Sequence, residues 1–436
     1  MVWIVLLFTA AAGLYMAWTI GANDVANSMG PVVGSRSVTI AQAIVVAGLC
    51  EFAGAVVAGS DVTNTIRKGI VEPSALAATP EVLCLGMICA LLAAAVWLHA
   101  ATWWGMPVST SHSIVGAVAG FGVVAAGAGS VYWGKLGQIV LSWFISPVVG
   151  LVLGFAIFRI IIRTVLGRAE PMAAAVRVTP VLAFVAALIV TLATIYKGLK
   201  NLMAQGRMEM TGGRALAIAA LVGAVAALVS RLLVRRSLRR CEGLSLAEQL
   251  LKVEGIFVPL AVISACSVAF AHGANDVANA IGPLAAVADI VATGSVKMSV
   301  HVPLWVLVLG GVGIVLGLGT FGYRVMRTIG SAITEITPSR AVAANIAAAT
   351  TVLACTRLSL PVSTSHTIVG AVLGVGFARG IGAVNRAITR NIFGSWLLTV
   401  PAAAGVAIAL FLLGRLLGAD LLLAQVIHAA PAAAAP

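Results

Sequence analysis

The 436-residue chain is 61% hydrophobic and only 9% charged, and its mean hydropathy is +1.09. A soluble domain carries about 25% charged residues, so this composition excludes a water-soluble protein and predicts a surface that lies mostly in lipid. The net charge of +13 does not indicate nucleic-acid binding, because the basic residues fall between apolar segments, where membrane topology and anionic lipid headgroups account for them.

Apolar segments of about 20 residues, the length that crosses a bilayer, recur along the chain. The first begins at Met1 without a basic region and leads straight into a polar motif, so we expect a retained span rather than a signal peptide. The sequence predicts an all-α polytopic membrane protein with about twelve transmembrane segments. They are expected at residues 1–20, 39–59, 81–103, 107–128, 136–163, 178–197, 213–234, 254–272, 302–322, 341–357, 361–379 and 391–417. Hydropathy leaves open whether the fourth and eleventh cross fully or re-enter.

Basic residues between the spans predict the orientation. The densest cluster follows the seventh span, and the positive-inside rule places it in the cytoplasm. Other odd-numbered connections are also basic, so both termini are expected on the external side. The C-terminal segment, residues 421–436, ends in an Ala/Pro low-complexity stretch at 429–436 and is expected to be a disordered tail. The residues of the densest cluster are Arg235, Arg236, Arg239, Arg240 and Lys252.

Two motifs occur twice in the same order. The sequence GANDVAN at 21–27 recurs at 273–279, and PVSTSH at 107–112 recurs at 361–366. Both second copies follow about 250 residues later, which indicates a duplication. The first and eighth spans are seven apart and cross in opposite directions, so we predict two inverted repeats of about five spans with broken or half helices. The predicted organisation is 1–165 as the first inverted repeat, 166–250 as linking spans six and seven with a basic cytoplasmic loop, 251–420 as the second repeat, and 421–436 as the tail.

The GANDVAN motif places a carboxylate and amides at a membrane span. An ionised Asp near lipid costs at least ~2.5 kcal/mol and must face a partner or water. Carboxylate and amide oxygens suit a hard cation, and Gly21 with Gly30-Pro31 is expected to loosen the backbone and free carbonyls for the same purpose. Helix capping at a span boundary is the alternative, but two copies favour a cation site. Its residues are Asn23, Asp24 and Asn27 with Asn275, Asp276 and Asn279.

The PVSTSH motif predicts a helix that begins with hydroxyl side chains. Pro opens a helix well, and a helix N-terminus offers unpaired N–H groups and a positive dipole to an oxyanion. The motif contains no Arg or Lys, which suits a protein that must release its cargo. An ordinary capped helix is the alternative, and the duplication favours a substrate site. Its residues are Ser109, Thr110 and Ser111 with Ser363, Thr364 and Ser365.

Three further side chains are candidates for coupling or selectivity. His112 and His366 close the PVSTSH motifs, where a packing role is favoured and a role in proton coupling or as a substrate donor stays open. Glu51 lies within the second span, where carboxylates are rare, and is expected to be functional. The six cysteines lack metal-ligand spacing, so we expect no cofactor besides coupling ions.

These residues resemble the inorganic phosphate transporter family (PiT), which carries duplicated GANDVAN and PVST(S/T)H motifs. The likeness continues through 65–70 and 336–340 and covers almost the whole chain. It implies a non-enzymatic symporter of inorganic phosphate, driven by sodium or protons through alternating access. It also implies a multi-pass protein of the plasma (inner) membrane with external termini, frequently a homodimer. The GANDVAN residues would then bind sodium, and the PVSTSH residues would bind phosphate.

One position departs from the resemblance. The family usually has a Glu in the tenth span, whereas this chain has Asn345. An amide neither repels dianions nor shares a proton, so sulfate or another tetrahedral oxyanion is the second candidate substrate. A channel fits two separate half-site motifs poorly. A membrane enzyme acting on lipid phosphates would use His112, Asp24 and Ser109, but the chain has no large soluble loop to cover a headgroup.

Overall fold

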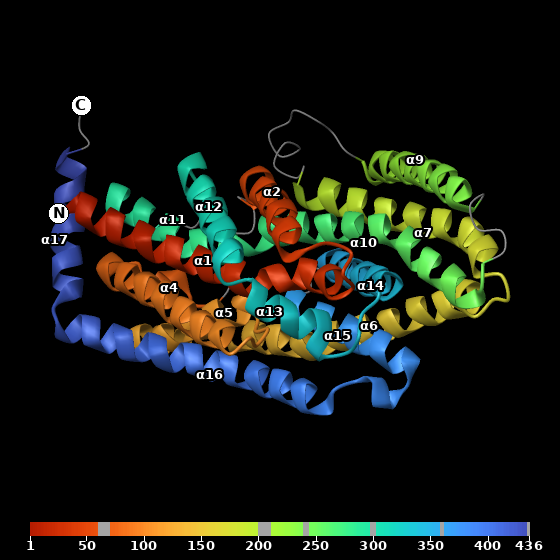
Figure 1. The fold of residues 1–436 in the computed structure, drawn as a ribbon. Coiled ribbons are helices and arrows are strands. Elements are labelled where there is room, and N and C mark those ends of the chain that lie inside the picture. Colours follow the sequence, from red (N-terminus) through yellow and green to blue (C-terminus); the bar gives the residue numbers. More distant parts are fainter. Residues whose placement is uncertain (60–69, 199–210, 239–243, 297–301, 358–361, 434–436) are drawn as a thin grey trace.

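The computed structural model describes residues 1–59, 70–198, 211–238, 244–296, 302–357 and 362–433, and Figure 1 shows that helices dominate them. The sole extended pairing among these residues is one bridge between Val71 and Val131. The prediction of an all-α membrane protein is confirmed. The α-helices are α1 (Val2–Gly34), α2 (Ile40–Ala58), α4 (Pro80–Trp103), α5 (Thr110–Ala126), α6 (Trp133–Ile161), α7 (Pro171–Ala193), α9 (Gly212–Leu238), α10 (Leu246–Asp276), α11 (Ala278–Thr293), α12 (Leu304–Thr320), α13 (Tyr323–Arg327), α14 (Pro338–Arg357), α15 (Thr364–Arg379), α16 (Arg386–Leu416) and α17 (Ala419–Ala433).

Eight of the described helical segments are long and apolar enough to cross a membrane, and the bent pair α12–α13 makes a ninth. The fourth and eleventh predicted spans correspond to α5 and α15, with 17 and 16 residues. At 1.5 Å per residue each is about 25 Å long, shorter than the ~30 Å hydrocarbon core. These two helices therefore begin inside the protein, next to the GANDVAN motifs.

The first span differs from its prediction. α1 does not end near residue 20 but continues through the GANDVAN motif and Pro31 to Gly34. The second copy is interrupted only at Val277, whose backbone angles remain helical (φ −54°, ψ −33°). The prediction that the glycines and Pro31 break the helix and free carbonyls is therefore wrong for the first copy.

The motif glycines serve close helix packing. A Cβ on Gly21 would overlap the carbonyl oxygen of Ile314, and one on Gly317 would overlap that of Trp18, so α1 and α12 cross backbone to backbone. The same crossing recurs between α10 and α2, where Gly273 meets Glu51. Small residues at such crossings let helices approach closely in a membrane.

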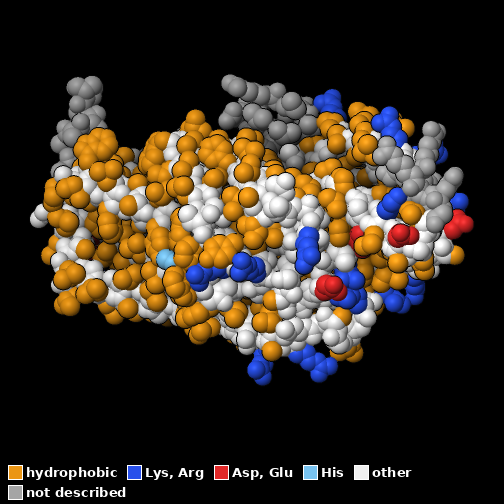
Figure 2. Space-filling view, viewed as in Figure 1, with side chains coloured by type: hydrophobic (Ala, Val, Ile, Leu, Met, Phe, Trp, Pro, Cys, Tyr) orange, Lys and Arg blue, Asp and Glu red, His pale blue; other side chains and the backbone are white. Residues whose placement is uncertain are grey.

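The other helices repeat this pairing. α4 packs on α1 and α14 packs on α10, while α5 packs on α16 and α15 packs on α6. Both termini lie at one end of the molecule in Figure 1. In Figure 2 the Lys and Arg side chains of the visible face gather toward the opposite end, and hydrophobic side chains cover most of the rest.

The last described segment is a helix where the sequence predicts a disordered tail. α17 covers 419–433, and Arg415 Nε donates to Asp420 Oδ2 at 3.1 Å near its start. Leu423, Val426 and Ile427 are buried, and the helix packs on α4 and α11. The prediction is wrong for 421–433 because these apolar side chains find a partner surface, while 434–436 lie outside the described residues.

The α1–α12 crossing generates a stability test. Gly317→Ala should lower the thermal unfolding midpoint in detergent, because its methyl group would overlap the Trp18 carbonyl and such overpacking costs about 1–3 kcal/mol. Gly319→Ala in the same helix is the matched control, since its Cβ would meet only Ile44 Cγ2 at 3.9 Å. Equal midpoints for the two variants would contradict the close crossing.

Candidate functional site

The two PVSTSH motifs start helices as predicted. The Ser109 hydroxyl accepts a hydrogen bond from the His112 backbone N–H at 3.4 Å, and Ser363 accepts one from that of His366 at 3.3 Å. Each of these serines is thus the N-cap of its helix, α5 or α15. Capping uses the hydroxyl oxygen and leaves its hydrogen available to another acceptor.

Asn23 positions the segment that leads into α5. Its Oδ1 accepts from the Val108 N–H at 3.1 Å, and its Nδ2 donates to the Met106 carbonyl at 3.0 Å and to Thr102 Oγ1 at 2.9 Å. Its side chain therefore fixes the helix start instead of joining the other motif residues. Asn275, the equivalent residue, is half-buried and makes no hydrogen bond to the cluster within the described ranges.

Asp24 joins both PVSTSH helices. Its two carboxylate oxygens accept from Thr110 Oγ1 of α5 and, at 2.8 Å, from Ser365 Oγ of α15. Asn27 Nδ2 donates to Asp24 Oδ1 at 2.9 Å and to Ser365 Oγ at 2.8 Å. The first GANDVAN copy thus contacts the PVSTSH residues of both halves.

Asp276 makes hydrogen bonds equivalent to those of Asp24, but at longer distances. Thr364 Oγ1 donates to Asp276 Oδ2 at 3.3 Å. Asn279 Nδ2 lies 3.3 Å from Asp276 Oδ1 and 3.4 Å from Ser111 Oγ. The structure therefore brings two Asp–Asn pairs together with four of the six predicted hydroxyl residues, Thr110, Ser111, Thr364 and Ser365.

His272 connects the two aspartates and was missed by the sequence analysis. Its Nε2 lies 3.0 Å from Asp276 Oδ2 and 3.6 Å from Asp24 Oδ2, and its Nδ1 lies 3.3 Å from Glu51 Oε1. All three contacts are within ion-pair distance, but neither ring nitrogen of His272 is aligned for a hydrogen bond with a described residue. The sequence feature that could have indicated His272 is its place as a polar residue at the end of an apolar span, directly before the second GANDVAN motif. The equivalent residue before the first motif is Ile20.

The cluster is closed to solvent and rich in acceptors. Asp24, Glu51, His272 and Asp276 are each at most 2% exposed. Asn27 Oδ1 and both Glu51 oxygens accept no hydrogen bond from the described residues. No Lys or Arg in the described ranges forms an ion pair with the three carboxyl groups, so His272 is the sole basic side chain of the described residues in contact with them. Buried charge of this kind needs a compensating cation or proton.

The same geometry fits a small cation. One ligand atom each from Asp24, His272 and Asp276 lies within 4.8 Å of the other two. The free Asn27 oxygen and the carboxylate oxygens suit a hard ion such as sodium, whereas a ring nitrogen suits softer metals. A neighbouring cavity of about 40 Å³, lined in part by Asn27, His272 and Thr364, holds a few water molecules at most. A tetrahedral oxyanion therefore needs the helices to move apart.

His112 and His366 form a packed aromatic group at the other side of the helix starts. His112 stacks on Trp143 and His366 on Trp396, each at 3.7 Å between ring centroids, and the two histidines meet edge to face at 4.5 Å. His366 Nδ1 also lies 3.3 Å from the Trp143 carbonyl oxygen. This geometry favours the packing interpretation.

Asn345 takes no part in the hydrogen bonds of the aspartate cluster. Its Nδ2 donates to Ser264 Oγ at 3.2 Å, and its Oδ1 is buried without a partner among the described residues. Ser264 precedes His272 by eight residues on α10, which corresponds to about 12 Å along the helix. The predicted selectivity role of Asn345 stays a prediction, and its neighbours Ala348 and Ala349 on α14 line the small cavity beside His272.

Comparisons with known proteins identify the family of the chain. The model of the phosphate transporter family matches residues 20–407. The chain belongs to this family. A protein of Pyrococcus abyssi named as a phosphate permease is 46% identical over 93% of this chain and 97% of its own length. Inorganic phosphate transporter 2-1, chloroplastic, of Arabidopsis thaliana is 41% identical over 92% of this chain and 70% of its own. A solved sodium-dependent phosphate transporter superposes with a TM-score of 0.82 at 41% identity, covering 95% of this chain and 99% of that one.

Substitution of His112 and substitution of His272 should have opposite effects on phosphate uptake. His112→Phe should retain phosphate uptake and its pH profile in proteoliposomes, because both His112 ring nitrogens are buried without a hydrogen-bond partner among the described residues and a phenyl ring can stack on Trp143. His272→Phe should remove concentrative uptake, since it deletes the group between the carboxylates. Equal losses in the two variants would contradict this division of roles.

Proposed function

We propose that this protein is a secondary active symporter that carries inorganic phosphate with sodium or protons by alternating access, as a homodimer in the plasma (inner) membrane. One observation carries the proposal: hydroxyls from the starts of two helices converge on two buried aspartates that lack a Lys or Arg partner among the described residues. Membership of the phosphate transporter family and the likeness to a sodium-dependent phosphate transporter support the substrate and the ion.

Coupling follows from competition for the same hydroxyl hydrogens. Thr110, Ser365 and Thr364 donate to Asp24 and Asp276 in this structure. A cation on the carboxylate oxygens would weaken these bonds and release the hydroxyls to donate to phosphate. The start of α5 and the start of α15 would add N–H groups and their dipoles. Each ligand would thus raise the affinity of the other by the same factor.

Inverted repeats would supply the two access states. α1 with α12 and α10 with α2 make equivalent crossings, and the two pairs α5–α16 and α15–α6 are equivalent as well. Such a repeat pair, with sites where the halves meet, is typical of alternating access by rocking. We assign about twelve membrane segments to this plan, with α5 and α15 as short inner helices. The basic end opposite the termini in Figures 1 and 2 would face the cytoplasm.

Sulfate is the second candidate substrate because of Asn345. A carboxylate at that position would disfavour dianions, and the amide removes this effect. Asn345→Glu should therefore reduce sulfate competition and shift phosphate uptake toward lower pH.

The decisive assay is uptake of labelled phosphate into proteoliposomes with sodium and pH gradients imposed separately. Sodium-driven accumulation above equilibrium supports the proposal, and pH-driven accumulation assigns protons as the coupling ion. Flux that only equilibrates phosphate under both gradients would reject symport. Unlabelled sulfate added to the same assay measures which oxyanion is preferred.

The aspartates should be essential for accumulation. Asp24→Asn and Asp276→Asn keep the shape of the side chain but remove its charge, so each should nearly abolish concentrative uptake while the protein folds. Glu335→Gln is the control, because the Glu335 side chain is 74% exposed. Full uptake with unchanged sodium dependence in either aspartate variant would remove the ion assignment.

Replacement of the PVSTSH serines by Ala should give two different results, depending on whether the serine caps its helix. Ser111→Ala and Ser365→Ala should weaken phosphate binding by ~1.5–3 kcal/mol each, the range for a hydrogen bond to an ionised group. Ser109→Ala and Ser363→Ala should chiefly lower the unfolding midpoint, because loss of a cap costs about 1 kcal/mol of helix stability. Calorimetry that finds the affinity unchanged in Ser111→Ala and Ser365→Ala would refute the helix-start site.

A further inference from the structure

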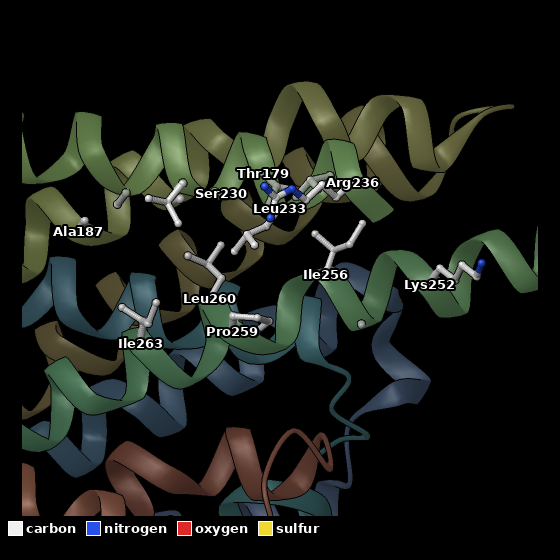
Figure 3. A pocket seen from close by; sticks show the side chains of 15 residues that line it. Thr179, Ala187, Ser230, Leu233, Arg236, Lys252, Ile256, Pro259, Leu260 and Ile263 are labelled. Atoms are coloured by element: carbon white, nitrogen blue, oxygen red, sulfur yellow. The ribbon is translucent and has the colours of Figure 1, made fainter. Parts of the chain in front are cut away.

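A second cavity lies far from the aspartate cluster, between α9 and α10. It has a volume of about 810 Å³ and is lined by these two helices and α7, which packs on both of them. Figure 3 shows the lining side chains from close by. Val229, Leu233 and Ile263 on its walls are each about half exposed. The cavity is therefore an open apolar groove, which a bilayer would fill.

The depth of the groove matches one leaflet. Along α10 its lining runs from Lys252 to Ile263, and along α9 from Ala226 to Arg236. At 1.5 Å per residue both stretches are about 15–17 Å long, close to half of the ~30 Å hydrocarbon core. A membrane helix of a second copy would span both leaflets and would exceed this groove at one end.

The lining changes from polar to apolar along that depth. Arg236 and Lys252 mark the end of the groove nearest the α9–α10 connection, and Ala187 and Ile263 mark the other end. The positive charge of Lys252 acts on the Glu248 carboxyl, whereas no ion pair joins Arg236 to another described residue. An amphiphile with a negative head and apolar chains has the same polarity profile.

Thr179 supplies an independent sign of a ligand. Its side chain is 2% exposed, and its hydroxyl has no hydrogen-bond partner among the described residues. Thr179 is the groove residue nearest the start of α7, with Ala183 and Ala187 one and two turns deeper on the same face. A buried hydroxyl without a partner is costly, and an ester or phosphate oxygen at the polar end would satisfy it.

We propose that this groove binds one anionic phospholipid of the leaflet at the basic end of the protein. The phosphate headgroup lies at Arg236, an oxygen of the headgroup or glycerol ester accepts from Thr179, and an acyl chain packs between α9 and α10. Basic pockets between membrane helices favour anionic headgroups. The inference does not depend on the transported substrate.

Native mass spectrometry of the full chain tests this directly, with dioleoyl phosphatidylglycerol compared with dioleoyl phosphatidylcholine, whose chains are identical. The wild type should retain one phosphatidylglycerol per chain about fivefold better than phosphatidylcholine, the factor expected for one basic residue near an anionic headgroup. Arg236→Gln should remove that preference, while the adjacent control Arg235→Gln should keep it. Thr179→Val should weaken both lipids, and Ala226→Phe should fill the groove and exclude both.

Several outcomes would overturn the proposal. Equal retention of the two lipids by the wild type, or a preference unaffected by Arg236→Gln, would remove the headgroup assignment. Lipid retained in full by Ala226→Phe, whose unfolding midpoint reports on its fold, would place the lipid elsewhere. Displacement of phosphatidylglycerol by millimolar inorganic phosphate would identify a free-phosphate site. A change from dimer to monomer in Ala226→Phe with lipid retained would identify a second copy as the occupant.

Discussion

The central constraint is negative charge held out of water. Asp24, Asp276 and Glu51 are buried around His272, and no Lys or Arg of the described chain pairs with them. Carboxylates in such a place need strong donors, and the hydroxyls at two helix starts supply them. Since a short helix can deliver its N-terminus to the membrane interior, the limited length of α5 and α15 follows from the same requirement.

Close packing brings these groups together. The aspartates sit on α1 and α10, and their carboxylates can meet only if the helices that surround them approach to backbone contact. Gly21 with Gly317, and Gly273 with its neighbour Glu51, provide that approach. The glycines of the motif therefore act through packing, and the polar site depends on them although none of them carries a functional group.

The sequence predicted the parts that are repeated. Two copies of each motif predicted paired helix starts and paired aspartates. A single motif is weak evidence for a functional site, whereas the same motif in two copies is strong evidence. The sequence analysis missed His272, which has Ile20 as its counterpart and so no second copy to indicate it. It also predicted broken helices at 21–31 and a disordered tail, because glycine, proline and alanine content describes local preference, whereas packing against α12 and α4 decides these segments.

The two phosphate-binding proposals differ in a way that matches what each ligand must do. The central site offers neutral hydroxyls and helix N-termini, whose attraction for an anion depends on cations bound beside it. Under the proposed symport, loss of those cations would return the hydroxyls to the aspartates and favour release of the anion. The groove at α9 offers the fixed charge of Arg236, which no coupling ion removes, and so favours a ligand that stays. The two proposals thus assign reversible charge to the site where the anion would pass and permanent charge to the site where a lipid would stay bound.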